Sequence, residues 1–401
     1  METLDERSMT HNRTAKPEII YFAPCSLGPG LGGGARLRNM IDILQRMELN
    51  IHLISYLPGE KFSIRHELAG ERLKVTTFSV RKSSIKLFKI FTLGLIMLHG
   101  LKGTSRSKVI FAHAPTIVSG LPALILSRIF RKPFVIDHMD IKDPDTPGFI
   151  YNRVLRGSAI LFVISRYLEE EGERLGCRKV VYLPIFIDTD AFKKDDLERS
   201  KIRRELGIND HEIVIGYAGS FWSGEGVPVL LKAFKNLAKS HANVKLILVG
   251  GGNVAGSDDI AGAIAELGLE KKIILVPPQL HELMPKYLST FDIACSPKID
   301  CEENRAANPV KIYEYMAMGL PIIISAVGEP SKVIENGIDG FLVKPGDVAD
   351  LESTLEQVIR NMAAAQKVGE KAREKILRNY NRQILSIRVE EALNEVLENK
   401  N

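Results

Sequence analysis

Short apolar runs alternate with helical patterns along most of the chain, and this alternation limits the possible folds more than any other feature. Apolar runs such as 51–56 and 213–218 are typical of buried strands, and amphipathic stretches follow them. Strands that alternate with helices form parallel sheets covered on both faces. Two such series, one in each half of the chain, predict an α/β protein with two doubly wound domains. The predicted strands are 18–23, 51–56, 75–79, 109–112, 134–137, 160–164 and 180–183 in the first half, and 213–218, 245–249, 273–276, 293–296, 321–325 and 340–343 in the second.

A charged segment that is poor in long apolar runs separates the two series. The chain ends in a helical pattern rich in Lys, Arg and Glu, with apolar residues that would bury one stripe. The predicted parts are a disordered N-terminus over 1–16, a first domain over 17–190, a linker over 191–210, a second domain over 211–375 and a C-terminal helix over 376–401.

The cysteine content excludes a disulfide scaffold, because there are four cysteines in 401 residues. They form no CxxC pair, so the sequence predicts no zinc or other metal site. The polar first residues lack the apolar core of a signal peptide. We therefore expect a cytoplasmic protein with reduced thiols.

Positive charge is concentrated in the first half of the chain. Residues 1–200 carry 30 Lys and Arg against 22 Asp and Glu, whereas residues 201–401 carry 24 against 27. An uncharged apolar run at 90–101 is flanked by Lys86, Lys89 and Lys102. A basic rim around an apolar helix is typical of a helix that lies on an anionic membrane, and ~12 residues are too few to span a bilayer. We expect 81–108 to contact the inner leaflet of the cell membrane; the alternative is a buried helix with solvated ends.

A glycine-rich loop follows the first predicted strand and precedes a helix. Glycines there let backbone N–H groups approach a phosphate at the helix N-terminus. Gly28, Gly30 and Gly33 match the GxGxxG pattern of dinucleotide sites, but a proline lies inside the turn and the next strand ends without an acid for a ribose. A phosphate contact by Gly32, Gly33 and Gly34 is the preferred interpretation, and an NAD-dependent enzyme is a weaker alternative.

The segment around a helix predicted over 310–318 is the most specific in the sequence. Pro309 suits the first turn of this helix and Gly319 suits its C-cap. Lys311, Glu314 and Tyr315 stand at i, i+3 and i+4, so they share one face. A carboxylate on a face toward a glycine-lined cleft can accept both hydroxyls of a ribose. The alternative for Glu314 is a solvated helix residue.

The sequence resembles the retaining nucleotide-sugar glycosyltransferases of family 4, which have the two-domain GT-B fold. The resemblance covers nearly the whole chain and includes the glycine loop at 32–34 before an Ala-x-Arg helix. The other segments that carry it are VISRYL at 163–168, LPIFIDTDAF at 183–192, YAGSF at 217–221, LVGGG at 248–252, EYMAMGLP at 314–321 and GIDGFLVKPGD at 337–347.

The resemblance implies two Rossmann-like domains that face each other across a cleft, with a C-terminal helix that crosses back to the first domain. It implies that the nucleotide sugar binds the second domain, with Glu314 on the ribose, and that the acceptor lies on the first-domain side. The other donor-binding residues that we predict are Gly32, Gly33, Gly34, Gly219, Ser220, Glu225, Gly251, Arg305, Asn308, Pro309 and Val310.

The chain departs from the family pattern at three positions. The family often has an acid eight residues before the helix glutamate, where this chain has Ala306. Ser220 and Glu225 replace an arginine and a lysine that normally stabilise the leaving diphosphate. These replacements motivate a second hypothesis, a non-catalytic protein of the same fold that binds a nucleotide sugar or a partner subunit. The cations that can substitute for them are Arg305, Lys311 and Lys298.

Polar residues also follow two predicted strands of the first half, where some family members have a histidine in the catalytic cleft. His138 and Asp140 follow the strand at 134–137, and His113 follows the strand at 109–112. We expect His138 and Asp140 to be catalytic together with Lys311 and Glu314, and His113 to lie on the acceptor side. The alternative for the two histidines and Asp140 is a helix cap or a satisfied polar contact.

The leading hypothesis is therefore a retaining, metal-independent enzyme that moves a sugar from a nucleoside-diphosphate sugar to an acceptor hydroxyl. A basic first domain suits an acidic polysaccharide precursor or a lipid-linked glycan, so we expect a role in the synthesis of such a glycan. We expect no cofactor besides the donor substrate and no nucleic-acid partner.

Overall fold

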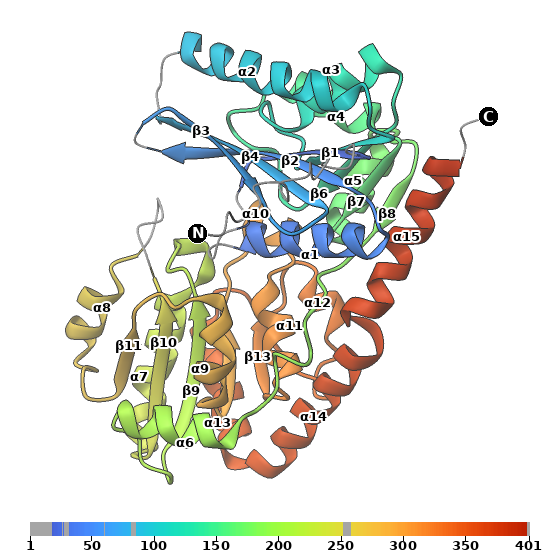
Figure 1. Cartoon of the computed structure of the whole chain (residues 1–401). Coiled ribbons are helices and arrows are strands. Elements are labelled where there is room, and N and C mark those ends of the chain that lie inside the picture. The colour runs from blue at the N-terminus through green and yellow to red at the C-terminus, as the bar shows by residue number, and fades with distance from the viewer. Residues whose placement is uncertain are drawn as a thin grey trace, which may run out of the picture.

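The computed structural model describes residues 18–25, 27, 32–59, 61–81, 86–251 and 258–398. It contains two sheets, each with helices on both faces (Figure 1). The first sheet has the strand order β3-β4-β2-β1-β5-β6-β7-β8, and all neighbours are parallel except β3 and β4. Its strands are β1 (Ile19–Ala23), β2 (Ile51–Gly59), β3 (Ser63–Leu68), β4 (Leu73–Arg81), β5 (Val109–His113), β6 (Phe134–His138), β7 (Ile160–Val163) and β8 (Val180–Tyr182).

Two helix layers cover the first sheet because the side chains of each strand alternate between its faces. Ile20 and Phe22 belong to the same buried cluster as residues of α2, α3 and α4. Ile19 and Tyr21 point to the other face and share a cluster with α1 and the C-terminal helix. The helices of this domain are α1 (Gly32–Arg46), α2 (Lys86–Thr104), α3 (Gly120–Phe130), α4 (Gly148–Gly157) and α5 (Arg166–Arg174).

The second sheet is entirely parallel, with the order β11-β10-β9-β12-β13-β14. Its strands are β9 (Ile213–Gly219), β10 (Val244–Gly250), β11 (Ile273–Val276), β12 (Ile293–Ser296), β13 (Ile322–Ser325) and β14 (Phe341–Val343). Its α-helices are α7 (Val227–Ser240), α8 (Ile260–Leu267), α9 (Met284–Ser289), α10 (Glu302–Ala306), α11 (Val310–Ala317), α12 (Pro330–Val333), α13 (Val348–Arg360) and α14 (Met362–Asn379), and two short 3-10 helices are η1 (Ser223–Glu225) and η2 (His281–Leu283).

The segment between the sheets contains a helix that is anchored to the second domain. This helix, α6 (Asp196–Glu205), is capped by the Asp195 carboxylate, which accepts hydrogen bonds from two backbone N–H groups. Arg199 and Arg203 on α6 each lie 2.6 Å from a carboxylate oxygen of Asp292. The segment predicted as a linker thus includes a helix that is fixed by ion pairs.

The C-terminal segment crosses back to the first domain, as predicted, but it is not one helix. α14 ends at Asn379 and α15 (Arg382–Glu398) begins after a break. The backbone N–H of Ile187 donates to the carbonyl of Tyr380 at 3.1 Å within this break. Leu385, Val389 and Leu393 of α15 are buried in the cluster beneath the first sheet. The prediction of one uninterrupted helix is wrong because a contact from a distant part of the chain interrupts it.

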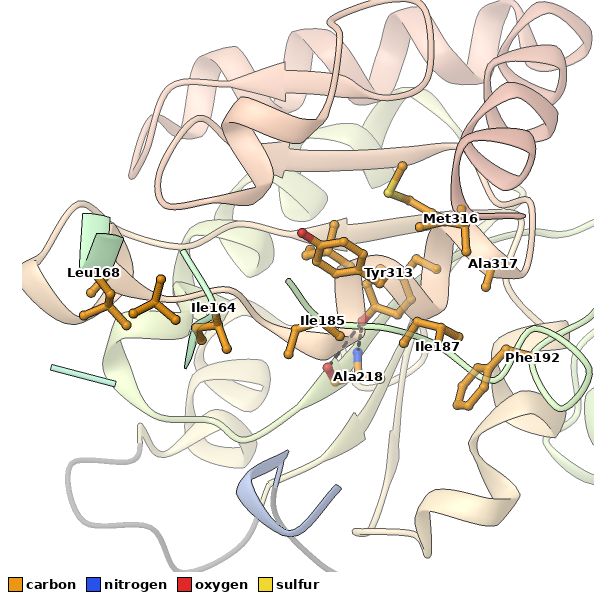
Figure 2. Close-up of a cluster of buried hydrophobic side chains, with 14 of the residues drawn as sticks. Ile164, Leu168, Ile185, Ile187, Phe192, Ala218, Tyr313, Met316 and Ala317 are labelled. Carbon is orange, nitrogen blue, oxygen red and sulfur yellow. Dashed lines mark hydrogen bonds between the residues drawn. The ribbon is translucent and has the colours of Figure 1, made fainter. Parts of the chain in front are cut away.

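One apolar cluster continues across the junction of the two domains (Figure 2). Ile164 and Ile185 reach it from the first domain, and Tyr313 and Met316 reach it from α11. The two sheets therefore meet over packed side chains at this side of the junction. Within the described residues, no helix combines the length and the hydropathy needed to cross a bilayer.

Candidate functional site

Two cavities lie side by side between the domains, at the carboxyl ends of the strands, where open α/β sheets bind ligands. Their volumes are about 240 Å³ and about 280 Å³, and Arg36, Ile185 and Val310 line both. The cavity that also contains Arg38, Phe192, His281 and Glu314 is called the Glu314 cavity. The cavity that also contains Asp140, Trp222, Glu225, Lys298, Asn308 and Pro309 is called the Lys298 cavity.

A buried carboxylate at the wall of the Lys298 cavity joins Lys298, which lines the cavity, to Lys311, which does not. Glu225 lies at the end of η1, and its Oε1 is 2.9 Å from the Nζ of Lys298. Its Oε2 is 2.7 Å from the Nζ of Lys311, which comes from the first turn of α11. Asn304 accepts a further hydrogen bond from Lys298 at 2.8 Å. The cluster of Glu225, Lys298 and Lys311 carries one net positive charge.

The cluster explains why a glycine stands at the end of β9. Gly219 has φ +148°, and a Cβ atom there would lie 2.4 Å from the Nζ of Lys311. The Lys311 ammonium also lies 4.4 Å from the centre of the Tyr217 ring. Any side chain at position 219 would therefore displace Lys311 from its place beside Glu225.

The two ammonium groups determine the charge state of Glu225. Burial by itself would raise the pKa of this carboxyl group, but Lys311 and Lys298 outweigh burial and lower the pKa to about 2. Burial lowers the pKa of Lys311, and Glu225 opposes that shift. Glu225 is thus ionised across the physiological pH range.

Glu314 faces the other cavity and is held by a histidine. Its Oε1 lies 2.6 Å from Nε2 of His281, at the start of η2. This hydrogen bond raises the pKa of His281, and burial opposes the shift. The His281 ring also packs on Phe192, with 5.4 Å between ring centres. A ligand that donates hydrogen bonds to both carboxylate oxygens of Glu314 must therefore compete with His281 for Oε1.

The predicted glycines lie at a helix start in the first domain and at strand ends in the second domain. The backbone of Gly32, Gly33 and Gly34 forms the first turn of α1, so this helix begins earlier than the sequence predicted. Gly28 and Gly30 lie outside the described residues. The N–H of Gly251 donates to the carbonyl of Gly219 at 3.0 Å, which ties two loops of the second domain together. The carbonyl of Ser220 accepts from the Tyr217 hydroxyl at 2.6 Å.

The two candidate histidines of the first domain do not line either cavity. His138 is buried, and its Nε2 lies 2.9 Å from the Tyr151 hydroxyl on α4. His113 is buried, with Nδ1 3.5 Å from a carboxylate oxygen of Asp137. Burial would lower the pKa of His113, but Asp137 raises it to about 9. The alternative of an internal polar contact describes His138 and His113 better than a place in the cleft does.

Asp137 anchors the first helix to the sheet beneath it. Arg36 on α1 donates from Nε and Nη2 to the Asp137 carboxylate, at 2.8 Å for the shortest contact. Its Nη1 donates to the carbonyls of Leu183 and Pro184. Burial would raise the pKa of Asp137, but the Arg36 guanidinium holds it well below its usual range. These contacts hold Arg36 in place where it lines both cavities.

The remaining predicted residues divide into two groups. Asp140, Pro309 and Val310 line the Lys298 cavity. Asn308 lines it too, but its Nδ2 donates across the domain junction to the carbonyl of Ile164 at 2.7 Å. Arg305 is exposed and pairs with the exposed Asp300 at 2.7 Å, and it lines neither cavity. Arg305 is therefore poorly placed to replace the missing cations, whereas Lys298 lines the cavity and is joined to Lys311 through Glu225.

Among the residues of the cleft that sequence reasoning missed are Arg38, Trp222 and His281. None of them belongs to a spacing pattern that indicates a ligand, and only the fold brings them to Glu314 and Lys298. Within the described residues, no three His, Cys, Asp or Glu side chains are grouped as metal ligands would be.

The arrangement of two Rossmann-like domains around a cleft, with a returning C-terminal helix, is the GT-B fold. Residues 198–375 match the family model described as glycosyl transferases group 1.

Two curated glycosyltransferases are similar to parts of the chain. The chain is 26% identical over 176 residues to D-inositol 3-phosphate glycosyltransferase of Mycobacterium sp. (strain KMS). The aligned residues make up 43% of this chain but only 38% of that enzyme. It is 24% identical over 281 residues to the alpha-D-kanosaminyltransferase of Streptomyces kanamyceticus, 65% of this chain and 70% of that enzyme.

Two solved structures share the fold of nearly the whole chain. HepE of Anabaena, crystallised with UDP and glucose, superposes with a TM-score of 0.73 at 19% identity over 94% of this chain and 99% of its own. Sucrose-phosphate synthase of Thermosynechococcus elongatus superposes with a TM-score of 0.78 at 17% identity over 95% and 99%.

Proposed function

We propose that the protein transfers a sugar from a nucleoside-diphosphate sugar to a hydroxyl group of a glycan or lipid-linked acceptor, with retention at the anomeric carbon. One observation carries this proposal: Lys298 lines the cleft, and Glu225 joins it to Lys311, which stands on the same helix as Glu314. Paired ammonium groups suit a diphosphate, and a carboxylate suits the two hydroxyls of a ribose. The family match of the second domain supports the same assignment.

Each group then has a distinct task. Glu314 accepts the ribose hydroxyls in place of His281, and Lys311 and Lys298 neutralise charge on the diphosphate. The first turn of α1 contributes backbone N–H groups to the donor phosphates, because the N-terminus of a helix favours an anion. Asp140, exposed on the first-domain side of the Lys298 cavity, orients the acceptor hydroxyl.

The chemistry needs no protein nucleophile. The bond from the anomeric carbon to the diphosphate oxygen breaks, and a bond to the acceptor oxygen forms on the same face. The acceptor proton passes to the leaving diphosphate. Retention and independence of a metal ion rest on the family resemblance, and the lysine pair supplies positive charge for the leaving group.

A second candidate rests on Glu225. Because this carboxylate cancels one of the two lysine charges, the site has less positive charge than an arginine and a lysine would give it. This lower positive charge is consistent with a non-catalytic protein of the same fold, which binds a nucleotide sugar without transferring it or binds no nucleotide sugar. It predicts no transfer to any acceptor.

The test is a thermal-shift panel with UDP, GDP, ADP, dTDP and NAD, followed by the sugar conjugates of whichever nucleotide stabilises the protein. UDP comes first because HepE was crystallised with UDP and with UDP-glucose. A ligand at roughly 100 times its Kd adds about 2.7 kcal/mol to the free energy of unfolding. A shift with NAD alone would favour a dinucleotide enzyme, and silence throughout would contradict donor binding.

The variant Glu314→Ala separates the proposed role from general stability. We expect this variant to lose stabilisation by the nucleotide and all sugar transfer, because the ribose loses its carboxylate. Glu356→Ala, in an exposed ion pair on α13, is the matched control and should keep both. Unchanged turnover of Glu314→Ala would contradict the role assigned to Glu314.

A further inference from the structure

The outer surface of α2 and α3 exposes large apolar side chains at helical spacing. Leu98 and Leu101 on α2 and Ile125 and Ile129 on α3 are all exposed, with Leu98 at 62% and Ile129 at 59%. The spacings of three and four residues put each pair on one face of its helix. These four residues, together with Lys102 and Arg128, are called the α2–α3 face.

The two helices present these residues in the same direction. The inner side of α2 packs against α3 and the sheet, because a Cβ atom at Gly100 would lie 2.7 Å from Leu126 and 2.8 Å from Phe22. Both helices cover the same side of the first sheet (Figure 1). Their outward sides therefore form one surface, on the side of the sheet opposite α1 and α15.

The part of the sequence that forms this surface is basic. The sequence contains no Asp or Glu from residue 72 to residue 136, whereas the same stretch contains 12 Lys and Arg. Lys102 and Arg128 are exposed on the helices themselves, and Arg131 is exposed directly after α3. A surface with an apolar centre and a basic rim matches the headgroup region of an anionic bilayer in both respects.

We propose that the α2–α3 face docks the protein on an anionic lipid bilayer. The exposed leucines and isoleucines enter the boundary between headgroups and acyl chains, and the basic residues pair with lipid phosphates. A nucleic acid would use the basic residues but would leave the four apolar side chains in water. The side chains of 86–92 lie outside the description, so the surface is defined by the C-terminal part of α2 and by α3. This inference does not rest on the proposed function.

The test is flotation of the full chain with vesicles of phosphatidylcholine alone and with vesicles of phosphatidylcholine and phosphatidylglycerol in equal parts. We expect binding only to the second kind, and weaker binding as salt is raised. The double variant Leu98→Gln with Ile129→Gln should weaken binding roughly tenfold or more, since it removes exposed apolar area without touching the core. Arg128→Gln should weaken it about fivefold, the effect of one basic residue near a charged membrane.

Matched controls keep the result specific. Leu197→Gln changes an apolar residue that is 85% exposed on α6 of the second domain, and it should leave binding unchanged. Melting temperatures and UDP-induced shifts measured on all variants separate a loss of docking from a loss of fold or of nucleotide binding.

Three outcomes would overturn the proposal. They are no flotation with anionic vesicles, full flotation of the Leu98→Gln and Ile129→Gln double variant, and binding to RNA that is weakened by Arg128→Gln but not by the apolar substitutions. The last outcome would assign the surface to a polyanion.

Discussion

Glu225 is the residue whose chemistry most distinguishes this cleft. A carboxylate between two largely buried ammonium groups stabilises both, and their side chains are only 9% and 13% exposed. Removing one partner of such a buried group leaves uncompensated charge, which is strongly destabilising. Glu225 therefore keeps two cations in the cleft while it reduces their net charge.

This arrangement predicts opposite effects of Glu225→Gln on stability and on ligand response. The free energy of unfolding should fall by about 3–5 kcal/mol, because Lys298 and Lys311 lose their counterion. A nucleoside diphosphate supplies negative charge at the same place, so UDP should stabilise the variant more than it stabilises the natural protein. Urea unfolding with and without UDP measures both quantities.

The control for this experiment is Glu356→Ala, because Glu356 belongs to an exposed ion pair on α13, away from both cavities. It should change neither quantity. Equal stabilisation of Glu225→Gln and the natural protein by UDP would show that the lysines do not meet the diphosphate.

The bond between His281 and Glu314 predicts a dependence on pH. Glu314 raises the pKa of His281, so this pair contributes stability that is complete below the unfolded pKa of about 6.5 and is lost as the pH rises through the folded pKa. The protonated histidine competes with a ribose for the carboxylate. UDP should therefore bind more tightly as the pH rises through that folded pKa.

His281→Gln is the comparison for the pH series. The glutamine amide does not titrate, but it still offers an N–H donor to Glu314. Titration calorimetry should give a flatter pH profile for this variant. Arg38 and Glu282 also act on His281, with opposite effects on its pKa, and both stay in place in the variant. Parallel profiles for the two proteins would assign the pH dependence to the nucleotide.

At the scale of the element, most strands were predictable because their residues are buried on both faces and read as apolar runs. β3 was missed because SIRHEL is polar and mostly exposed, and only its antiparallel pairing with β4 makes it a strand. The break between α14 and α15 depends on Ile187, which no local pattern reveals.

The same contrast holds for the site. The helix with Lys311 and Glu314 was recognised from its local sequence, but the partners His281 and Glu225 come from other elements and their contacts depend on the fold. His138 was misplaced because neighbouring side chains on β6 point to opposite faces, whereas His113 at the end of β5 lies beside Asp137. Asp137 meets Arg36 on α1, whereas His138 meets Tyr151 on α4.

The returning helix α15 offers a prediction about packing. Leu385 is fully buried against the first domain, so Leu385→Ala should lower the free energy of unfolding by about 2–5 kcal/mol. Ile387, two residues further on, is 53% exposed, and Ile387→Ala should change it by less than about 0.5 kcal/mol. Urea unfolding of the two variants compares them directly. Similar values would mean that α15 adds little to the stability of the first domain.

At the scale of the whole molecule, a carboxylate closes the junction between the domains. Glu329, at the start of α12, accepts a hydrogen bond from the N–H of Arg166 at 2.7 Å, and another from the Tyr182 hydroxyl at 2.7 Å. The first of these places a negative charge at the N-terminus of α5, which is a favourable position. Glu329 thus connects the second domain to two elements of the first.

Loss of this contact should open the molecule. For Glu329→Ala we expect a larger radius of gyration in small-angle X-ray scattering, because α12 no longer holds α5 and β8. Glu335→Ala changes an exposed residue shortly after α12 and should leave the radius unchanged. An unchanged radius for Glu329→Ala would show that apolar packing alone keeps the domains together.

The two chain crossings between the domains are joined to each other, since Ile187 pairs with the Tyr380–Asn381 break. We expect the cleft to open by rotation about this point, so that distances change least close to it. Ile187, Asp188 and Arg382 line the Glu314 cavity, whereas none of these three lines the Lys298 cavity. We therefore expect the Glu314 cavity to keep its shape during opening and the Lys298 cavity to widen. A nucleotide sugar would enter with its nucleoside seated first, and its diphosphate would be enclosed only as the domains close.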